Sequence, residues 1–382
     1  MKPLSPELEN PGVGLVSAKS SQAETRRPRD RAGLARLLLE GRAFFALIAI
    51  VIVFSSLSPN YFTVGNFLTM ATHVAIFGIL AVGMLLVILN GGIDLSVGST
   101  LGLSGVVAGF LMQGVTLQAF GVVLYPPVWV VAVLTCALGA FVGAVNGMLV
   151  ARFKVPAFVA TLGVMYVARG AALLMTNGLT YNNMAGRAEL GNTGFDWLGF
   201  NRLFGVPIGV LVLAVIAIIG GIVLGRSAFG RWLYASGGNE RAAELSGVPV
   251  KRVQVSVYVL SGICAAVAGL ILSSQLTSAG PTAGNSYELV AIAAVVIGGA
   301  ALSGGRGTVR GTLLGAFVIG FLSDGLVIIG ISSYWQTVAT GTVIVLAVLL
   351  NAVQYRRRVK LPASMGGSSG GQPTSLQPGG KH

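Results

Sequence analysis

The stretch GGNERAAELSG, residues 237–247, lies at the centre of a polar segment, 226–254, that is flanked by two long apolar runs. Asn239 is a favourable N-cap residue, and Glu240 places an anion in the first helical turn. Gly247, followed by Val-Pro, ends a helix. The stretch therefore predicts a short capped helix in a loop between two membrane-spanning helices, which is typical of a polytopic helical membrane protein.

The composition of the whole chain supports this fold class. Of the 382 residues, 54% are hydrophobic and 10% are charged, and the mean hydropathy is +0.82. We count apolar runs of about 20 residues, the length that crosses the hydrocarbon core. We expect an all-α polytopic membrane protein with a transmembrane domain at 43–354. The ten predicted spans are 43–57, 68–90, 95–113, 128–150, 156–176, 205–225, 254–276, 288–303, 311–330 and 335–354.

The distribution of basic residues predicts the orientation. An even number of spans places both termini on one side, and Lys and Arg are enriched in cytoplasmic loops. With the N-terminus inside, 22 of the 25 Lys and Arg residues fall in cytoplasmic segments. We therefore expect the 226–253 loop in the cytoplasm, and residues 1–42 and 355–382 as disordered cytoplasmic tails. Orientation and contact with anionic membrane lipid then explain the net charge of +13 without a nucleic-acid partner.

The predicted helix in the polar loop has two interpretations. Its alanines leave little side-chain bulk, so it fits a groove on another protein, with charged residues at the rim. Alternatively, it is a solvated connector between spans. Because a connector has no need of capping at both ends, we favour docking. The residues assigned to this helix are Asn239, Glu240, Arg241, Ala242, Ala243, Glu244, Leu245, Ser246 and Gly247.

A second motif, GGIDLSVGS at 91–99, lies at the end of the second predicted span. Its glycines and aspartate predict a break in the helix, with Asp94 or Ser96 capping the next span. The segment is either a tight turn or part of a gate. The pattern G-G-x-x-L-S-x-G recurs at 298–305, which indicates a duplicated half or a coincidence in a glycine-rich chain. The gate candidates here are Gly91, Gly92, Asp94, Ser96 and Gly98.

Ionisable residues within or beside the predicted spans are few. They are Arg169, Glu288 and Asp324, with Asp94 at a span edge. A charge at bilayer depth is costly, so each should face protein or a water-filled cavity. One interpretation is a proton or ion relay. The interpretation we favour places Arg169 and Glu288 near the interfaces, where they cap a helix or extend to the headgroups.

Motifs for nucleotide hydrolysis and zinc-dependent proteolysis are absent from the sequence. Neither a G-x-x-x-x-G-K-[ST] loop nor H-E-x-x-H occurs. We therefore expect that the chain is not an enzyme and that it binds no metal and no cofactor of its own. If ATP drives a process in which this chain takes part, ATP and Mg bind to a partner ATPase, and the capped helix is the natural contact.

Several motifs together resemble one family. They are NGGIDLSVGS at 90–99, NG at 146–147, VPAFVATLGVMYVARG at 155–170, GGNERAAELSGV at 237–248, YELVAIAAVVIGGAALSGGRGT at 287–308 and SSYWQTV at 332–338. From about Asn66 to Asn351 the chain resembles the permease subunits of bacterial ATP-binding-cassette importers for monosaccharides, of the ribose and xylose type.

The resemblance implies a set of partners and roles. It implies a permease homodimer in the bacterial inner membrane, a cytoplasmic ATPase with two nucleotide sites, and a periplasmic sugar-binding protein. It also implies that 237–247 is the coupling helix, and it adds Asn146 to the candidates for the translocation path or gate. The family pattern often carries Asn-Asn-Gly where this chain has Ser-Asp-Gly at 323–325, so Asp324 is a departure.

We therefore expect inward transport of a monosaccharide, a ribose- or xylose-like pentose or a hexose, by alternating access. Two alternatives remain open. One is the same architecture importing a nucleoside or a branched-chain amino acid. The other is an ion-coupled secondary transporter that uses Asp94, Glu288 or Asp324.

Overall fold

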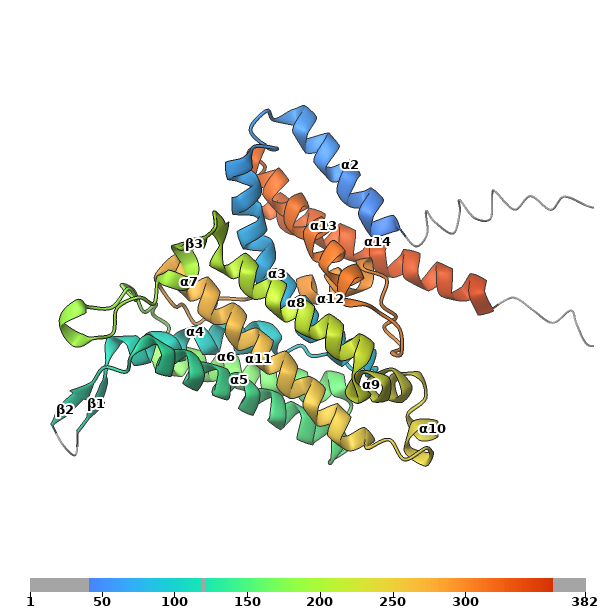
Figure 1. Cartoon of the computed structure of the whole chain (residues 1–382), viewed down its shortest axis with the longest axis horizontal. Helices are drawn as coiled ribbons and strands as arrows, with labels where there is room; N and C mark the ends of the chain where they lie inside the picture. Colours follow the sequence, from blue (N-terminus) through green and yellow to red (C-terminus); the bar gives the residue numbers. More distant parts are fainter. Residues whose placement is uncertain (1–40, 119–120, 360–382) are drawn as a thin grey trace, which may run out of the picture. The chain divides into compact units, whose positions relative to one another are not determined.

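Helices form most of the chain that the structure describes (Figure 1). The structure is a computed structural model and describes residues 41–118 and 121–359, so most of each predicted tail lies outside the described residues. The elements in chain order are α2 (Arg42–Leu57), α3 (Val64–Leu89), α4 (Val97–Gln113), β1 (Val115–Leu117), β2 (Val122–Leu124), α5 (Val128–Ala151), α6 (Ala157–Thr176), η1 (Ala188–Leu190), α7 (Trp197–Phe200), β3 (Arg202–Leu203), β4 (Val206–Pro207), α8 (Ile208–Arg226), α9 (Ala228–Gly238), α10 (Glu240–Leu245), α11 (Val250–Leu276), α12 (Tyr287–Ile297), α13 (Val309–Ile328) and α14 (Ser333–Val359).

The described helices include six that are long and apolar enough to cross a membrane: α3, α5, α6, α8, α11 and α13. Helices α2, α4 and α12 are apolar but shorter. The chain is therefore a mostly helical, polytopic membrane protein. The expectation of an all-α fold needs one correction, because β1 pairs antiparallel with β2 and β3 with β4 in two short hairpins between helices.

The eighth predicted span, 288–303, ends earlier in the structure. Helix α12 has 11 residues and stops at Ile297, because Gly298 and Gly299 follow and Gly299 has a φ of 91°. This left-handed conformation favours glycine and ends a helix. At 1.5 Å per residue the helix is about 16 Å long, which is too short to cross a hydrocarbon core of about 30 Å.

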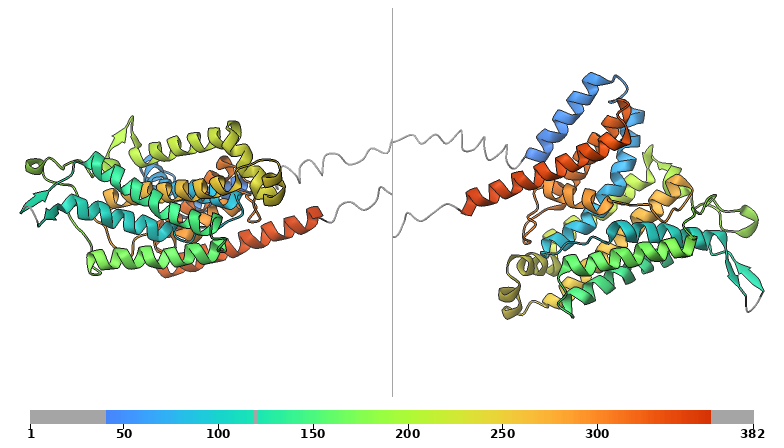
Figure 2. Two further views of the ribbon diagram at one scale, coloured as in Figure 1. Left: turned by 90° about the horizontal axis from the view of Figure 1, so that it is seen from below. Right: turned by 180° about the vertical axis from the view of Figure 1, so that it is seen from behind.

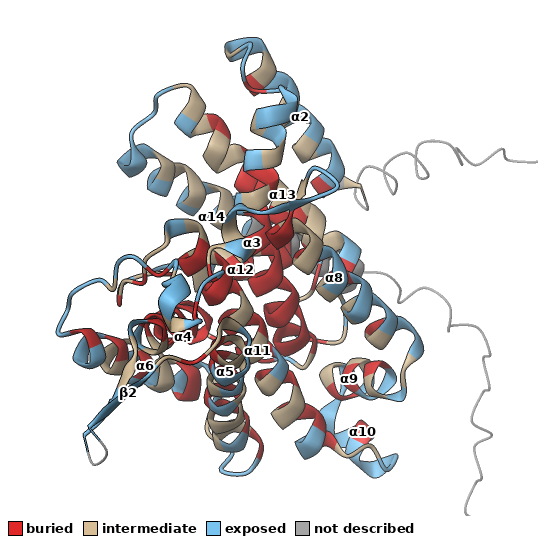
Figure 3. Ribbon diagram, turned by 60° about the vertical axis from the view of Figure 1, so that its left-hand side comes forward, coloured by how far each residue is buried: buried red, intermediate tan, exposed pale blue. Residues whose placement is uncertain are grey.

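Helix α3 lies at the centre of the bundle (Figures 1 and 3). Of its most apolar window, 83% is buried, compared with 22–28% for α5, α6 and α8. It contacts α8, α11, α12 and α13, and its buried residues form much of the largest apolar cluster. The outer helices present exposed apolar side chains such as Phe141, Tyr166 and Ile218, which suit contact with lipid.

Glycines bring α5 and α11 close together. Gly139, Gly143 and Gly147 recur every fourth residue on α5, and all three face α11. A Cβ atom at Gly139 would overlap the carbonyl oxygen of Gly262 on α11. Small residues at this spacing allow two membrane helices to pack backbone against backbone. Because α11 also contacts α3 and α4, this packing fixes the frame around the candidate site.

The loops gather at two ends of the bundle. Helices α9 and α10 lie at one end, whereas the β1–β2 hairpin and α7 lie at the other (Figures 1 and 2). The loop before α7 is attached to the C-terminal end of α4, because the side-chain amide of Asn192 donates to the carbonyl of Met112.

Candidate functional site

The polar loop folds as α9 followed directly by α10. Asn239 separates them, and its Oδ1 accepts a hydrogen bond from the N–H of Ala242 at 3.0 Å. At the other end Gly247 has a φ of 82°, and the N–H of Val248 donates to the carbonyl of Ala243 at 3.0 Å. This is a Schellman arrangement. Both ends of the helix are therefore capped by the residues from which the sequence predicted it.

One side of α10 faces its own chain. Ala243 is 5% exposed, whereas Leu245 is 82% exposed. The expectation that the alanines of this helix fill a partner's groove is thus wrong for Ala243, because it packs against this chain. The Nζ of Lys154, in the α5–α6 loop, donates to Oε1 of Glu240 at 3.3 Å, so one rim charge is engaged within the chain. The exposed residues of the helix other than Glu240 are Arg241, Ala242, Glu244 and Leu245, and we call them the outer face of α10.

The end of α9 packs against the end of α3 through glycines. Gly237 lies so close to the carbonyl oxygen of Leu89 and to the N–H of Gly305 that a Cβ atom would overlap the first and crowd the second. The N–H of Gly305 donates to the carbonyl of Leu89 at 2.9 Å, and Gly304 lies against Gly91. The two similar glycine motifs of the sequence therefore meet in space at the base of the polar loop.

Asp94 is buried in the non-helical linker between α3 and α4, with 1% of its surface exposed. Its Oδ1 accepts hydrogen bonds from the N–H and Oγ of Ser96, at 3.0 and 2.6 Å. Its Oδ2 accepts one from Oγ of Ser261 on α11 at 3.0 Å. The side-chain amide of Asn146 on α5 donates to Oγ of Ser96 at 2.8 Å. We call these four residues the Asp94 cluster, and it joins the linker to two neighbouring helices.

The cluster differs from the predicted capping. Ser96 is the N-cap residue of α4, but its side chain makes no capping hydrogen bond, because its hydroxyl donates to Asp94 instead. Neither residue therefore caps α4 through its side chain. Sequence reasoning also missed Ser261, which is a small polar residue inside an apolar span and carries no local signal.

The glycines of the motif at 91–99 are needed for two different reasons. Gly91 has a φ of 84°, so its backbone conformation favours glycine. Gly98 instead leaves space, because a Cβ atom there would overlap Oε2 of Glu288 and the carbonyl oxygen of Gly284. At Gly92 a Cβ atom would lie 2.5 Å from the hydroxyl oxygen of Tyr258, so space is also limited there.

Arg169 on α6 points into the protein and does not extend to the headgroups. Its Nη1 donates to the carbonyls of Pro281 and Ala283, the latter at 2.8 Å. Gly102 on α4 makes room for it, since a Cβ atom there would lie 2.9 Å from Nη1. Arg169 therefore ties α6 to the loop before α12. Glu288 lies in the first turn of α12, where the helix dipole stabilises an anion, in line with the capping interpretation.

Asp324 on α13 has a partner that sequence reasoning missed. Its Oδ1 lies 2.9 Å from Nδ1 of His73 on α3, with the two side chains 16% and 51% exposed. Within the described residues its Oδ2 is buried and has no hydrogen-bond partner. His73 carried one usable signal, because it is the only histidine in a predicted span. The pair joins α3 to α13 and lies apart from the polar loop.

Comparison with known proteins places these elements in one family. The family model described as "Branched-chain amino acid transport system / permease component" matches residues 66–348. The chain is 44% identical to the ribose import permease protein of Escherichia coli K12, over 82% of this chain and 94% of that protein. It is 45% identical to the ribose import permease protein of Bacillus subtilis, over 81% and 91%. It is 35% identical to the xylose transport system permease protein of Escherichia coli K12, over 82% and 91%.

No solved structure matches the chain. The Asp94 cluster, α10 and the pair of His73 with Asp324 all lie inside the region that the family model matches. The relatives are transport permeases, so the chain is a transport subunit and not an enzyme, as the sequence predicted. The chain belongs to the permease family that includes these ribose and xylose permease proteins.

Proposed function

We propose that the chain is the membrane-spanning subunit of an importer that moves a monosaccharide inward, driven by ATP hydrolysis on a partner ATPase. The likeness to ribose and xylose permeases extends over most of both chains, so we assign a ribose- or xylose-like pentose, or a hexose, as the cargo. The description of the family model favours a branched-chain amino acid as the second candidate. Family membership disfavours the ion-coupled alternative.

The working complex in this proposal contains two copies of the permease, a cytoplasmic ATPase and a periplasmic sugar-binding protein. Ten segments cross the membrane with both termini in the cytoplasm, and α12 crosses together with the non-helical segment 298–308 that follows it. The end of the bundle that carries α10 then faces the ATPase. The opposite end, with the β1–β2 hairpin and α7, faces the binding protein (Figure 1).

The observation that carries the proposal is a continuous contact path from α10 to the centre of the permease. Helix α10 shares Asn239 with α9, and α9 packs through Gly237 on the carbonyl of Leu89. The chain after Leu89 is the linker that holds Asp94. These contacts at the glycines are between backbones, so no flexible side chain absorbs a displacement.

Through this contact path the ATPase can change the side of the membrane to which the permease is open. When nucleotide binding moves the ATPase, a docked α10 moves with it, and α9 shifts the end of α3. The Asp94 cluster holds the linker against α5 and α11 in one arrangement. A second arrangement of the linker needs these hydrogen bonds to exchange, which makes the linker an element with two discrete states. A neutral sugar needs no charged side chains along its path through the permease.

The docking step is tested by Leu245→Asp, with Leu179→Asp as the matched control. Leu245 is 82% exposed on α10, and Leu179 is 71% exposed in the loop after α6. Burying a leucine in an interface contributes about 1.5–3 kcal/mol, so we expect Leu245→Asp to weaken ATPase binding by more than tenfold. Leu179→Asp should leave ATPase binding unchanged. The measurement is co-purification of the ATPase together with sugar uptake and the abundance of the permease in the membrane.

A second variant tests the charge at the same surface. Glu244 is exposed and has no ion-pair partner among the described residues, whereas Glu240 already contacts Lys154. Glu244→Arg should therefore reduce ATPase binding without disturbing the loop. Normal abundance, uptake and ATPase binding in both Leu245→Asp and Glu244→Arg would show that α10 is only a connector.

The proposed topology is tested separately. Single cysteines at Ser246 and Thr193, both exposed, are introduced after Cys136 and Cys264 are replaced. A membrane-impermeant thiol reagent added outside intact spheroplasts should label Thr193→Cys but not Ser246→Cys. Labelling of both from outside would contradict the placement of α10 in the cytoplasm.

A further inference from the structure

A basic groove lies where the C-terminal end of α5 meets the N-terminal end of α11. It has a volume of about 640 Å³ and no acidic residue in its lining. Three of its lining side chains are cationic and come from both helices: Arg152, Lys251 and Arg252. The rest of its wall is mostly apolar and includes Met148, Ala151 and Val255.

These cations have no partner within the described part of the chain. All three are exposed, and none forms an ion pair there, since the neighbouring contact to Glu240 is made by Lys154. Lys251 and Arg252 lie in the first turn of α11, where the helix dipole disfavours a cation. The positive-inside rule accounts for basic residues at such helix ends. It does not account for their convergence, from two helices, on one groove.

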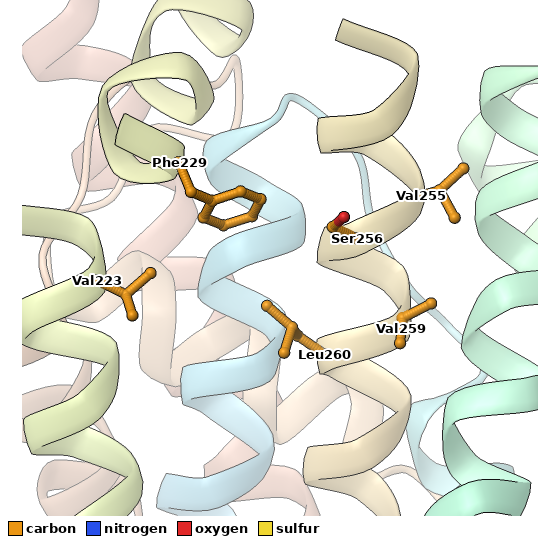
Figure 4. Close-up of a pocket in the computed structure, with 6 residues that line it drawn as sticks. All are labelled: Val223, Phe229, Val255, Ser256, Val259 and Leu260. Carbon is orange, nitrogen blue, oxygen red and sulfur yellow. The ribbon is translucent and has the colours of Figure 1, made fainter. Parts of the chain in front are cut away.

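A second groove continues along the other side of α11, with a volume of about 410 Å³ (Figure 4). Val223 of α8 and Phe229 of α9 point toward the side of α11 that carries Leu260. The two grooves share Val255 and Ser256, so they flank the same ridge of α11. Apart from the Ser256 hydroxyl, the side chains that line this second groove are apolar.

We propose that the two grooves together bind one anionic phospholipid. Its phosphate lies between Arg152, Lys251 and Arg252, and its two acyl chains follow the apolar walls on either side of α11. Basic pockets between membrane helices bind anionic headgroups, and the charge of this groove has one sign only. The apolar side chains of the second groove suit the acyl chains of a lipid and provide no contact for a free inorganic anion. A cytoplasmic protein would contact the basic end but not a groove that continues along a membrane-spanning helix.

The site shares no residue with the outer face of α10 or with the Asp94 cluster, so it stands or falls independently of the proposed function. A lipid at this position bridges α5, α8, α9 and α11. It therefore links the frame of the Asp94 cluster to the helix that leads into α10. Permease in membranes that lack anionic lipid should lose stability at this junction.

The test is native mass spectrometry of the full-length permease in detergent, titrated with phosphatidylglycerol or with phosphatidylcholine. Phosphatidylglycerol should bind more tightly. Lys251→Gln with Arg252→Gln should weaken phosphatidylglycerol binding by about 30-fold, because each basic residue near an anionic lipid contributes about fivefold. The matched control, Arg306→Gln with Arg310→Gln, removes two exposed cations, one from the loop before α13 and one from its first turn, and should leave the affinity unchanged.

Two further arms separate lipid from other ligands. Val259→Trp fills the apolar wall and should weaken binding of phosphatidylglycerol while all three cations remain, and inorganic phosphate should not compete. Equal binding of the two lipids, an equal loss in both double variants, or competition by inorganic phosphate would overturn the proposal. A Lys251→Gln/Arg252→Gln permease that keeps its lipid but loses the ATPase would instead assign this surface to a protein contact.

Discussion

Removal of the Ser261 hydroxyl should uncouple α11 from the linker between α3 and α4. Its Oγ donates to Oδ2 of Asp94 at 3.0 Å, and each residue is 1% exposed. Hydrogen bonds between membrane helices contribute about 0.6 kcal/mol on average. The acceptor here is a carboxylate, and a hydrogen bond to a charged group contributes more, about 1.5–3 kcal/mol. We therefore expect Ser261→Ala to lower the free energy of unfolding by about 1.5–3 kcal/mol. Ser274→Ala is the matched control, because Ser274 is a buried serine of α11 that donates to a neutral carbonyl, that of Phe195.

A double-mutant cycle isolates the contact. Asp94→Ala removes the acceptor of all three hydrogen bonds, so adding Ser261→Ala should cost little more. The coupling energy between the two positions should be about 1.5–3 kcal/mol. The assay is unfolding by SDS titration in mixed micelles, with sugar uptake measured in parallel. Losses that add to within about 0.5 kcal/mol would refute the reasoning, because additivity means that the two side chains do not interact.

Three further predictions concern the packing of two glycines and the pair of His73 with Asp324. Gly98→Val should abolish sugar uptake, because its side chain would overlap the backbone of the loop before α12; uptake at the unmodified rate would show that this approach is not needed. Gly143→Leu should lower the free energy of unfolding by about 1–3 kcal/mol, while Gly163→Leu, at a position with open space, should not; equal effects in SDS titration would contradict the packing of α5 on α11. His73→Ala should cost about 1–3 kcal/mol by leaving the Asp324 carboxylate unpaired, and adding Asp324→Asn should recover part of it; no recovery would show that the pair does not act as a unit.

Local features of the fold could be predicted from the sequence, because their causes lie within a few residues. Asn239 and Gly247 cap α10 through bonds to neighbours three to five residues away. Apolar runs predicted the long helices for the same reason. The eighth span was predicted too long, because the Ala-Ala-Leu that follows Gly298 and Gly299 continues the apolar run although the glycines end the helix.

Contacts between distant segments could not be predicted in this way. His73 and Asp324 are 251 residues apart, and Ser261 is 167 residues from Asp94, so only the fold brings them together. The inward direction of Arg169 has the same origin, because its acceptors lie in the loop before α12. The sequence also could not distinguish Ala243, which faces this chain, from Ala242, which faces outward.

The central claim, ATP-driven import of a monosaccharide, is tested most directly by uptake into proteoliposomes. The purified permease is reconstituted with its ATPase and its binding protein, and entry of labelled ribose and xylose is followed with and without ATP. We predict uptake of at least one sugar that requires ATP and all three components and that an excess of unlabelled leucine or of a nucleoside does not reduce. Uptake that proceeds without ATP when a proton gradient is imposed, or competition by leucine alone, would contradict the claim.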